Sequence, residues 1–584
     1  MDKTEVIAGE PHVMQALIDP YVLGENEDAP SSSTSIIGLL QKQLQAEAAS
    51  GWKLACLPRP WKMPMEEVEA TERLENAPKH SLPPINVPET VTAGPRPLFP
   101  EVFFSVFTGQ EFESTPPDTD IAVSLIRDGL LDSINILDFN RNVTAKFLID
   151  IDCFFAEGTF VKRATPFDRL KDVEPGKSTW KPEDVAVDTV FSQIFQLPAP
   201  EHKVVYYHSV LTEACKLAPA AIAPSLGRAI RYLYRATSRM DLELSHRFID
   251  WFSHHLSNFG FTWKWTEWEE DVYLSSIHPR KAFILAAIDK EIRLSFSRRI
   301  KGTLPPAYQD LIGPDMEKDV PDFKFNDPNM PFAAEGKEIE SLLRRKAPDE
   351  DFQPIIEKIH TAALDAALDP LVASTDVFMT TVCAVGSKSL SHILTYIDRT
   401  KGRLIDVGGA SEAARAQIIS SVMAYWLNHP GVAISIIEKL LNYSILTPLS
   451  VVEWVLLAGS SNHHPSEREG RRPGESLAQA HMFEMVLHTI GKVTGRMRQV
   501  ALASMDKSGY AQEAKAMRDL FRVMDDALVS WADGTKDEMM ESADIDSERA
   551  PIVRRWGERW MRVFRRKAAI EEAFLIEAGK NMSL

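Results

Sequence analysis

The sequence has few cysteines and no long run of apolar residues. Its four cysteines, Cys56, Cys153, Cys215 and Cys383, lie far apart, and none forms a CxxC pair. Disulfide frameworks and zinc sites both need closely spaced cysteines, so we predict four buried free thiols in an intracellular protein. No stretch reaches the roughly 18 consecutive apolar residues of a membrane-spanning helix. The first residues also carry charges where a secretory signal would be apolar, so we expect a soluble protein.

Positive charge is also in short supply. Lys and Arg number 65 against 83 Asp and Glu, which gives a formal net charge of −18 at pH 7. A field of that sign repels a phosphate backbone except at a locally basic patch, so RNA binding by the bulk of the surface is disfavoured. The content of hydrophobic residues, 44%, is that of an ordinary globular protein. Because a single core stops growing near about 250 to 300 residues, we expect two or three domains.

Two glycine-containing segments are incomplete versions of nucleotide-binding motifs. In GKST at 176–179, Lys171 occupies the position of the first glycine of a phosphate-binding loop, and no hydrophobic strand precedes it. LIDVGGAS at 404–411 lacks the G-x-G spacing and the alternating strands of a dinucleotide-binding fold. We interpret the first segment as an exposed turn. We interpret the second as a connection between helices, with Ser411 as N-cap and Glu412 in the first turn.

Histidine pairs do not form a metal-binding motif. His254 and His255 are adjacent, as are His463 and His464, and adjacent helical positions point about 100° apart. We expect the first pair to be half-buried packing and the second to be solvated. There is no GxSxG motif, and no Cys/His or paired-carboxylate constellation stands out. We therefore predict a protein that is not an enzyme and has no catalytic residues, cofactor or metal.

Helical periodicity dominates the chain. Tyr207, Val210, Leu211 and Ala214 recur at i, i+3, i+4 and i+7, and Ile249, Phe252, Leu256 and Phe259 repeat the pattern. Pairs of such helices joined by short Pro or Asn/Gly turns are typical of stacked helical hairpins. We predict an all-α, HEAT-like fold of two domains, in which 405–409 (IDVGG) is the best candidate for a strand.

The domain limits follow from proline and glycine clusters. Helices end near such clusters, and proline-rich stretches favour extended connectors. We predict an N-terminal helix at 36–49 with a proline-rich connector in 1–96, a helical-repeat domain at 97–300, a linker at 301–334, and a second helical-repeat domain at 335–584 with loops at 459–476 and 533–550.

The C-terminal segment 552–574 combines tryptophans with arginines. Val553, Trp556, Trp560, Val563 and Phe564 share one face of a helix, and a second face carries Arg555, Arg559, Arg562 and Arg566. Such helices can bind membrane surfaces or RNA. In an acidic protein we favour another reading, in which the tryptophans seal a core and the arginines contact the protein's own carboxylates or a partner subunit. These four arginines are our candidates for a partner interface.

Two long segments resemble a known family. VFSQIFQLPAPEHKVVYYHSVLTEACKLAP at 190–219 and HRFIDWFSHHLSNFGFTWKWTEW at 246–268 closely resemble the middle domain of the large subunit of the nuclear cap-binding complex. Weaker resemblance extends to 96–107, 423–446 and 451–456, and 477–574 resembles the fungal version of the family.

The resemblance implies three domains of stacked helix pairs, similar to the middle domain of the scaffold subunit of the cytoplasmic cap-binding initiation factor. On this comparison the first domain is missing from the chain, and residues 1–96 correspond to the connector that follows it. The basic nuclear localisation signal that the family carries near its N-terminus is not visible in this sequence.

The resemblance further implies a scaffold that does not itself grip the 7-methylguanosine cap. A small RNA-recognition-motif subunit holds the cap, and the large subunit forms a heterodimer with it and orders its flexible segments. Capped RNA is then an indirect partner, and importin and export adaptors are others. The implied location is the nucleus with shuttling to the cytoplasm, in support of splicing, RNA export and mRNA quality control. The alternative is a related helical scaffold of translation or mRNA decay that recruits an RNA helicase.

Overall fold

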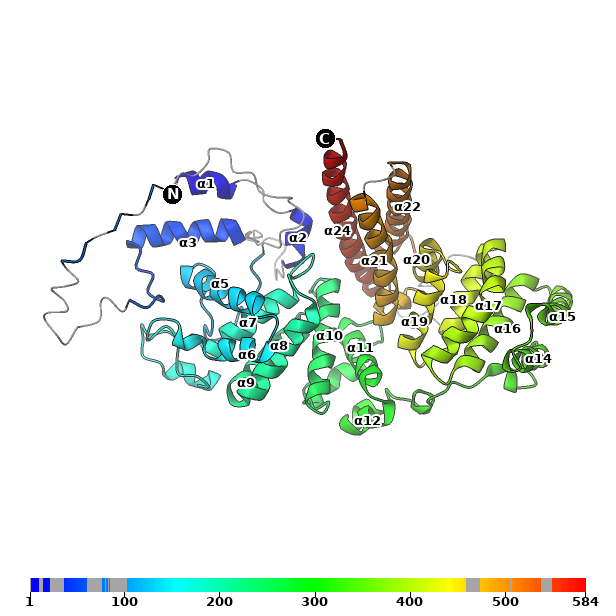
Figure 1. Cartoon of the computed structure of the whole chain (residues 1–584). Coiled ribbons are helices and arrows are strands. Elements are labelled where there is room, and N and C mark those ends of the chain that lie inside the picture. Colours follow the sequence, from blue (N-terminus) through cyan, green and yellow to red (C-terminus); the bar gives the residue numbers. More distant parts are fainter. Residues whose placement is uncertain are drawn as a thin grey trace. The chain divides into compact units, whose positions relative to one another are not determined.

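The protein is built from helices throughout the part of the chain that the structure describes (Figure 1). The computed structural model describes residues 2–9, 14–21, 36–59, 76–78, 80–81, 83–84, 102–457, 473–503, 507–536 and 549–583. The predicted all-α fold of stacked helical hairpins is confirmed. The predicted strand at 405–409 is wrong, because these residues lie inside a helix that runs from Leu390 to Ala410.

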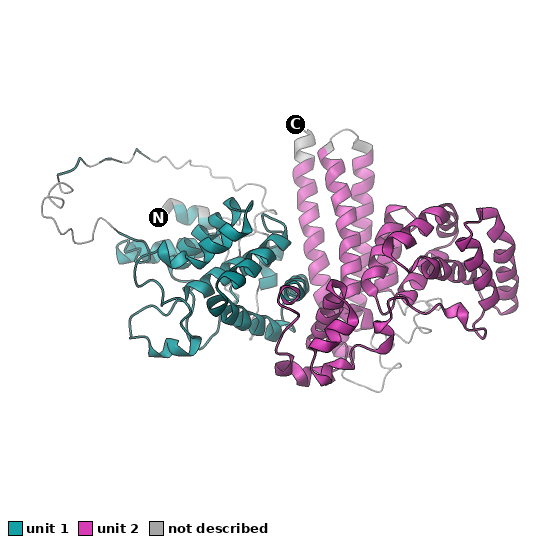
Figure 2. Cartoon of the chain, turned by 60° about the horizontal axis from the view of Figure 1, so that its bottom comes forward, with its two compact units in different colours: residues 1–255 teal, residues 256–584 magenta. Residues whose placement is uncertain are grey.

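The chain divides into two compact units, residues 1–255 and 256–584, which Figure 2 colours separately. This division differs from the predicted boundary, and the predicted domain limits stay a prediction. Residues 301–334 contain several short helices. Tyr308 lies among them, is fully buried, and donates a hydrogen bond of 2.8 Å to the carbonyl oxygen of Trp265.

Unit 1 contains twelve helical elements among its described residues. They are α1 (Asp2–Gly9), α2 (Gln15–Ile18), η1 (Asp19–Tyr21), α3 (Ile36–Ser50), α5 (Ile121–Ile136), α6 (Arg141–Ile149), η4 (Ile151–Cys153), η5 (Phe167–Asp172), α7 (Pro182–Ile194), α8 (Val204–Leu217), α9 (Pro219–Ala236) and α10 (Leu242–Asn258), whose last turn belongs to unit 2. The predicted N-terminal helix is confirmed as α3.

N-cap side chains and prolines mark the starts of several of these helices. The side chains of Asp120 and Asn140 accept backbone N–H groups at the starts of α5 and α6. Prolines occupy the first positions of α7 and α9, where the missing N–H costs nothing. Helix α7 packs against α5, α6, α8 and α9, and nearly all of its residues are buried. It is the central helix of unit 1.

The predicted core positions in unit 1 are buried. Tyr207, Val210, Leu211 and Ala214 on α8 are all at most 2% exposed, and α8 packs against α6, α7 and α9. On α10 the apolar seam is likewise buried at Ile249 and Phe252. The predicted burial of all four thiols is wrong for one of them, because Cys153 is exposed at the end of η4, which follows α6.

Unit 2 contains the remaining elements. They are η6 (Trp265–Tyr273), α11 (Pro279–Leu294), α12 (Ser297–Thr303), α13 (Pro306–Gln309), η7 (Pro314–Glu317), η8 (Lys324–Asn326), α14 (Ala333–Arg344), η9 (Asp349–Phe352), α15 (Gln353–Asp365), α16 (Pro370–Gly386), α17 (Leu390–Ala410), α18 (Glu412–Tyr425), α19 (Pro430–Asn442), α20 (Pro448–Leu456), η11 (Glu475–Ala478), α21 (Ala480–Ala503), α22 (Lys507–Ala532) and α24 (Arg549–Ser583).

Helices α14 to α20 form a stack in which most helices contact both the next helix in the sequence and the one after it. Helix α16 is central, since it packs against α14, α15, α17 and α18. A glycine permits close packing beside it: a Cβ at Gly386 would lie 2.5 Å from the Cα of Ile393 on α17. Ser411 caps α18 and Glu412 opens it, as predicted. The predicted connection at 404–411 is shorter than expected, because residues 404–410 extend α17.

The stack ends in three long helices that lie side by side in both views (Figures 1 and 2). We call α21, α22 and α24 the terminal bundle. Helix α24, of 35 residues, packs along α22 and also contacts α21 and η11. Most of the proline-rich connector lies outside the described residues, as does most of each predicted loop, including His463 and His464.

Candidate functional site

The C-terminal helix α24 is the element that the sequence singles out, and its tryptophans are core residues. Val553, Trp556, Trp560, Val563 and Phe564 are all buried, as predicted. The ring of Trp560 packs edge-on against Phe483 of α21, with 5.1 Å between the ring centroids. Aromatic pairs of this geometry stabilise a core beyond the area that they bury.

Each indole N–H in this region has a backbone partner. Trp560 donates to the carbonyl oxygen of Leu477 in η11 at 2.8 Å, and Trp556 donates to that of Ile277 at 2.7 Å. Trp531 of α22 donates to the carbonyl oxygen of Leu456, the last residue of α20, at 2.8 Å. The three indoles join α24 and α22 to segments that lie far away in the sequence. They make the terminal bundle one packed body with the stack beside it.

The four candidate arginines divide into two pairs. Arg555 and Arg562 are exposed, and Arg562 forms an ion pair of 3.6 Å with Glu558. Arg559 and Arg566 are buried, at 8% and 3% exposure, and the guanidinium of Arg559 lies 4.7 Å from the ring centroid of Trp556. Only Arg555 and Arg562 therefore offer charge to a partner. Whether any of the four contacts a partner stays a prediction.

Three other arginines, which the sequence did not single out, tie the terminal bundle together. Arg498 of α21 donates two hydrogen bonds to Glu571 of α24, at 2.9 and 2.7 Å. Arg518 of α22 forms the same kind of pair with Glu572 at 2.9 and 2.6 Å. Arg565 of α24 pairs with Asp525 of α22 at 2.6 and 3.0 Å. Bidentate pairs of this kind set the register of adjacent helices.

A fourth ionic cluster joins α11 to α21. Arg293 donates to Glu484 at 2.9 Å and forms an ion pair with Asp289 at 2.6 Å, while Lys290 lies 3.7 Å from Glu484. The partly buried cations Lys290 and Arg293 hold the pKa of Glu484 below its ordinary value. Gly431 at the start of α19 lets Arg293 approach, because a Cβ there would lie 2.7 Å from its Nε. The cluster holds α11 against the stack.

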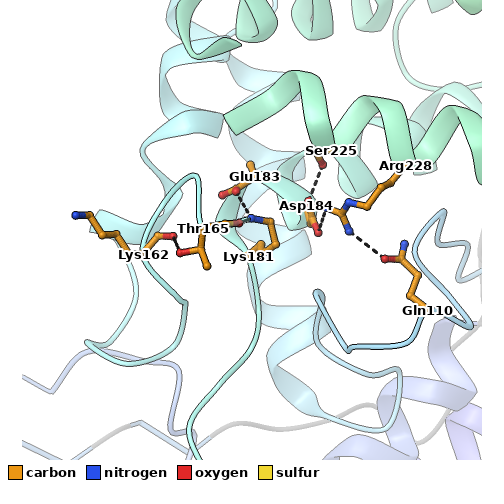
Figure 3. A network of polar contacts seen from close by, with 8 residues as sticks. All are labelled: Gln110, Lys162, Thr165, Lys181, Glu183, Asp184, Ser225 and Arg228. Carbon is orange, nitrogen blue, oxygen red and sulfur yellow. Dashed lines mark hydrogen bonds and ion pairs between the residues drawn. The ribbon is translucent and has the colours of Figure 1, made fainter. Parts of the chain in front are cut away.

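A network of buried polar contacts lies at the start of α7 in unit 1 (Figure 3). Asp184 accepts a hydrogen bond of 2.7 Å from Ser225 and forms an ion pair of 2.5 Å with Arg228, both on α9. Glu183 lies 2.6 Å from the ammonium of Lys181. Each of these two buried carboxylates has a cation beside it. Both carboxylates lie in the first turn of α7, where the helix dipole favours negative charge. Ser225 is itself buried and its hydroxyl is used by Asp184, so the network ties α7 to α9.

A second buried pair anchors the same helix to α5. Arg127 donates to Asp188 at 2.6 Å and to the carbonyl oxygen of Phe104 at 3.0 Å. The other carboxylate oxygen of Asp188 accepts the backbone N–H of Val106 at 2.8 Å. With this full set of partners the charges are satisfied internally, so the pair is a structural connection rather than a free catalytic group.

Three histidines gather between α8 and α10 without forming a metal site. The rings of His208 and His254 have centroids 5.3 Å apart, and His254 and His255 are half-buried, as predicted. Burial, with a smaller effect of His254, lowers the pKa of His208 to about 3 and that of His255 to about 4. Within the described part of the chain, no group of three or more His, Cys, Asp or Glu side chains is arranged to hold a metal ion.

Glu291 on α11 is a buried acid of a different kind. Its side chain is fully buried, and neither carboxyl oxygen has a hydrogen-bond partner. Burial raises its pKa to about 8, so the group is mostly neutral at pH 7.

The glycine-containing segment 176–179 is a turn in which Gly176 adopts a φ of +88°. Among the residues that the structure describes, no helix is long and apolar enough to cross a membrane.

Comparison with known proteins adds two kinds of match. A family model described as MIF4G like matches residues 116–306, and a second model of the same description matches residues 323–573. The chain is 30% identical over 520 residues to nuclear cap-binding protein subunit 1 of Schizosaccharomyces pombe, in an alignment that covers 89% of this chain and 62% of that protein.

Two further relatives carry related names. Nuclear cap-binding protein complex subunit 1 of Eremothecium gossypii is 27% identical over 399 residues, or 62% of this chain and 46% of that protein. Nuclear cap-binding protein subunit 1 of Oryza sativa subsp. japonica is 27% identical over 452 residues, or 76% of this chain and 48% of that protein. The chain thus spans less than two thirds of the length of these curated relatives.

Proposed function

Because the chain is a homologue of the proteins named nuclear cap-binding protein subunit 1 and carries two MIF4G-like domains, we propose that it is the non-catalytic scaffold of a nuclear RNA cap-binding complex. The observation that carries the proposal is the alignment with the Schizosaccharomyces pombe relative over 89% of this chain. The proposed partner is a small subunit with an RNA-recognition motif, which holds the 7-methylguanosine cap. Splicing, RNA export, mRNA quality control and shuttling from the nucleus belong to the same proposal.

The packing of unit 2 supports a scaffold role. A scaffold increases a partner's affinity for its ligand by holding flexible segments of the partner in their bound conformation, which requires a surface that does not itself rearrange. The indole hydrogen bonds and the bidentate arginine pairs connect the terminal bundle to its neighbours at several separate points. Such cross-connections favour a fixed surface over a mobile one.

Co-expression with the small subunit tests the proposal. We expect the two chains to co-elute on size exclusion as a 1:1 complex. Fluorescence titration with a 7-methylguanosine triphosphate analogue should show at least tenfold tighter binding by the complex than by the small subunit alone. Equal affinities with and without this chain would contradict the scaffold role. Recovery of an RNA helicase and no small subunit in a pull-down would favour the alternative scaffold of translation or decay.

The exposed arginines of α24 have their own test. We expect the double variant Arg555→Glu/Arg562→Glu to weaken assembly with the small subunit about tenfold, because charge reversal at an interface removes attraction and adds repulsion. The matched control is Arg298→Glu/Arg522→Glu, since these arginines are 77% and 71% exposed on α12 and α22. Assembly by the first variant at the strength of wild type would remove α24 from the interface.

A further inference from the structure

A small group of lysines in unit 2 lies around one tyrosine. The ammonium of Lys401 on α17 is 4.7 Å from the ring centroid of Tyr443, and the ammonium of Lys439 on α19 is 4.9 Å from the same centroid. Both distances are within the range of a cation–π interaction. All three side chains are partly exposed. Two helices therefore direct positive charge at one aromatic ring near the surface.

A third lysine from the next helix extends the group. Lys492 of α21 donates a hydrogen bond of 2.8 Å to Asn442, the residue before Tyr443, and forms an ion pair of 3.0 Å with Glu438. Helix α19 contacts both α17 and α21, so the three lysines come from three adjacent helices. We call Lys401, Lys439, Tyr443 and Lys492 the basic patch. Its only ion pair within the described residues uses Glu438.

Two of these lysines lack an acidic partner within the described residues, which is unusual for this protein. Carboxylates outnumber basic side chains by 83 to 65, and most of the cations described above have an acidic partner. Lys401 and Lys439 form no ion pair within the part of the chain that the structure describes. Their ammonium groups lie within about 10 Å of each other, which is about one Debye length at 0.1 M salt, so their fields add.

Part of this arrangement has a structural explanation. Lys439 lies in the last turn of α19, where a cation is favoured by the helix dipole. That reason does not apply to Lys401, which comes from the interior of α17. Helix stability alone therefore explains one lysine and leaves the convergence of charge from a second helix unexplained.

We propose that the basic patch binds single-stranded RNA, with Lys401, Lys439 and Lys492 contacting phosphates and Tyr443 stacking on a base. Sites for single strands combine positive charge along the backbone with an aromatic platform for the bases. An acidic peptide would use the lysines but would have no use for the ring. Planar carboxylates are also better matched by arginine, which the patch lacks, whereas lysine binds phosphate as a point charge.

The proposal goes beyond the scaffold function, which needs no RNA contact by this chain. The negative charge of the whole protein restricts RNA to places where the local field is reversed. The basic patch brings three ammonium groups together and pairs one of them with a carboxylate, that of Glu438. When another subunit holds the cap, the RNA that follows the cap would make a second contact at the basic patch. This contact would increase the affinity for the RNA and fix the direction of its path.

Binding of an uncapped, fluorescein-labelled 20-nucleotide RNA to the full chain alone tests the proposal. We expect Lys401→Ala/Lys439→Ala to bind at least tenfold more weakly in 50 mM salt by fluorescence anisotropy. The slope of log affinity against log salt should fall by about 1.4, since each phosphate contact on a single strand contributes about 0.7. Tyr443→Ala should lower affinity about tenfold and leave the slope unchanged, and Tyr443→Phe should bind like wild type.

The control variant is Lys388→Ala/Lys515→Ala, which removes the same charge from two exposed positions outside the patch. We expect it to bind RNA like wild type. Equal RNA binding by the patch variant and the control variant would overturn the proposal, as would no RNA binding by wild type at low salt. Tighter binding of a labelled oligoglutamate peptide than of RNA would overturn it in favour of an acidic protein partner. Because the small subunit is absent, these outcomes are independent of the scaffold test.

Discussion

At the scale of single residues, a difference of a few tens of degrees around a helix decides whether an arginine of α24 is buried. The four candidate arginines of α24 look equivalent in the sequence, yet Arg559 and Arg566 are buried while Arg555 and Arg562 are exposed. At 3.6 residues per turn, Arg559 lies about 60° around the helix from Trp556, and Arg555 lies about 100° from it. The smaller angle places Arg559 at the edge of the buried face. The angle of each arginine relative to the buried tryptophans can be read from a helical wheel. It is lost when the helix is divided into only two faces.

Glu291 leads to a prediction at the same scale. The native state keeps a proton that the unfolded chain releases between its ordinary pKa near 4.5 and the native pKa of about 8. The free energy of unfolding therefore falls as pH rises through this window. Glu291→Gln cannot ionise, so we expect it to be more stable than wild type by ~4 kcal/mol at pH 8.5 and nearly equal at pH 4.5. Urea unfolding at both pH values, followed by circular dichroism, measures the difference.

Glu350→Gln is the control for that substitution, because Glu350 is exposed. It should leave the difference between the two pH values unchanged. A parallel loss of stability with pH in wild type and Glu291→Gln would show that the Glu291 carboxyl is already ionised in the native protein.

At the scale of elements, the ends of the long helices are held by contacts between distant segments. Trp556 of α24 reaches the carbonyl oxygen of Ile277, which is 279 residues away in the sequence. The pattern of apolar residues predicts that Trp556 is buried. It cannot predict which backbone oxygen accepts the indole N–H, because that depends on which distant segment of the chain packs beside Trp556.

Trp556→Phe tests this connection. The substitution keeps an aromatic side chain but leaves a buried carbonyl oxygen without its donor, which costs ~1 to 3 kcal/mol. We expect a lower midpoint of urea unfolding by circular dichroism. Trp52→Phe is the matched control, since Trp52 is 46% exposed, and its midpoint should stay at the wild-type value. A loss for Trp556→Phe no greater than that of the control would show that the hydrogen bond adds nothing to stability.

At the scale of the whole molecule, the two units should respond to pH in opposite ways. In unit 1, burial lowers the pKa of His208 to about 3, so below the ordinary pKa near 6.5 the unfolded state binds more protons and stability falls with falling pH. In unit 2, Glu291 makes stability fall with rising pH. We expect hydrogen exchange, corrected for intrinsic rates, to show α8 opening more often at pH 5 than at pH 7. Helix α11 should open more often at pH 8 than at pH 6.

His208→Gln should reduce the response of α8 to acid, and Glu291→Gln should abolish that of α11 to alkali. Equal changes in protection across both units at either pH would contradict the assignment of the two responses to these residues. Unit 1 also contains His254 and His255, and burial lowers the pKa of both. A part of the acid response of α8 should therefore persist in His208→Gln.

The sequence by itself determined the class of fold and most of the core, because a period of 3.6 residues in apolar side chains describes how a helix faces its neighbours. It also indicated the resemblance to the large cap-binding subunit through two long segments. Only the tertiary structure decided that 405–409 is helical, that Cys153 is exposed, and that Arg498, Arg518 and Arg565 join the terminal bundle. The arginines pair with residues 40 to 73 positions away, and the basic patch unites three helices. Distances between such residues are set by how helices pack, and local periodicity contains no information about them.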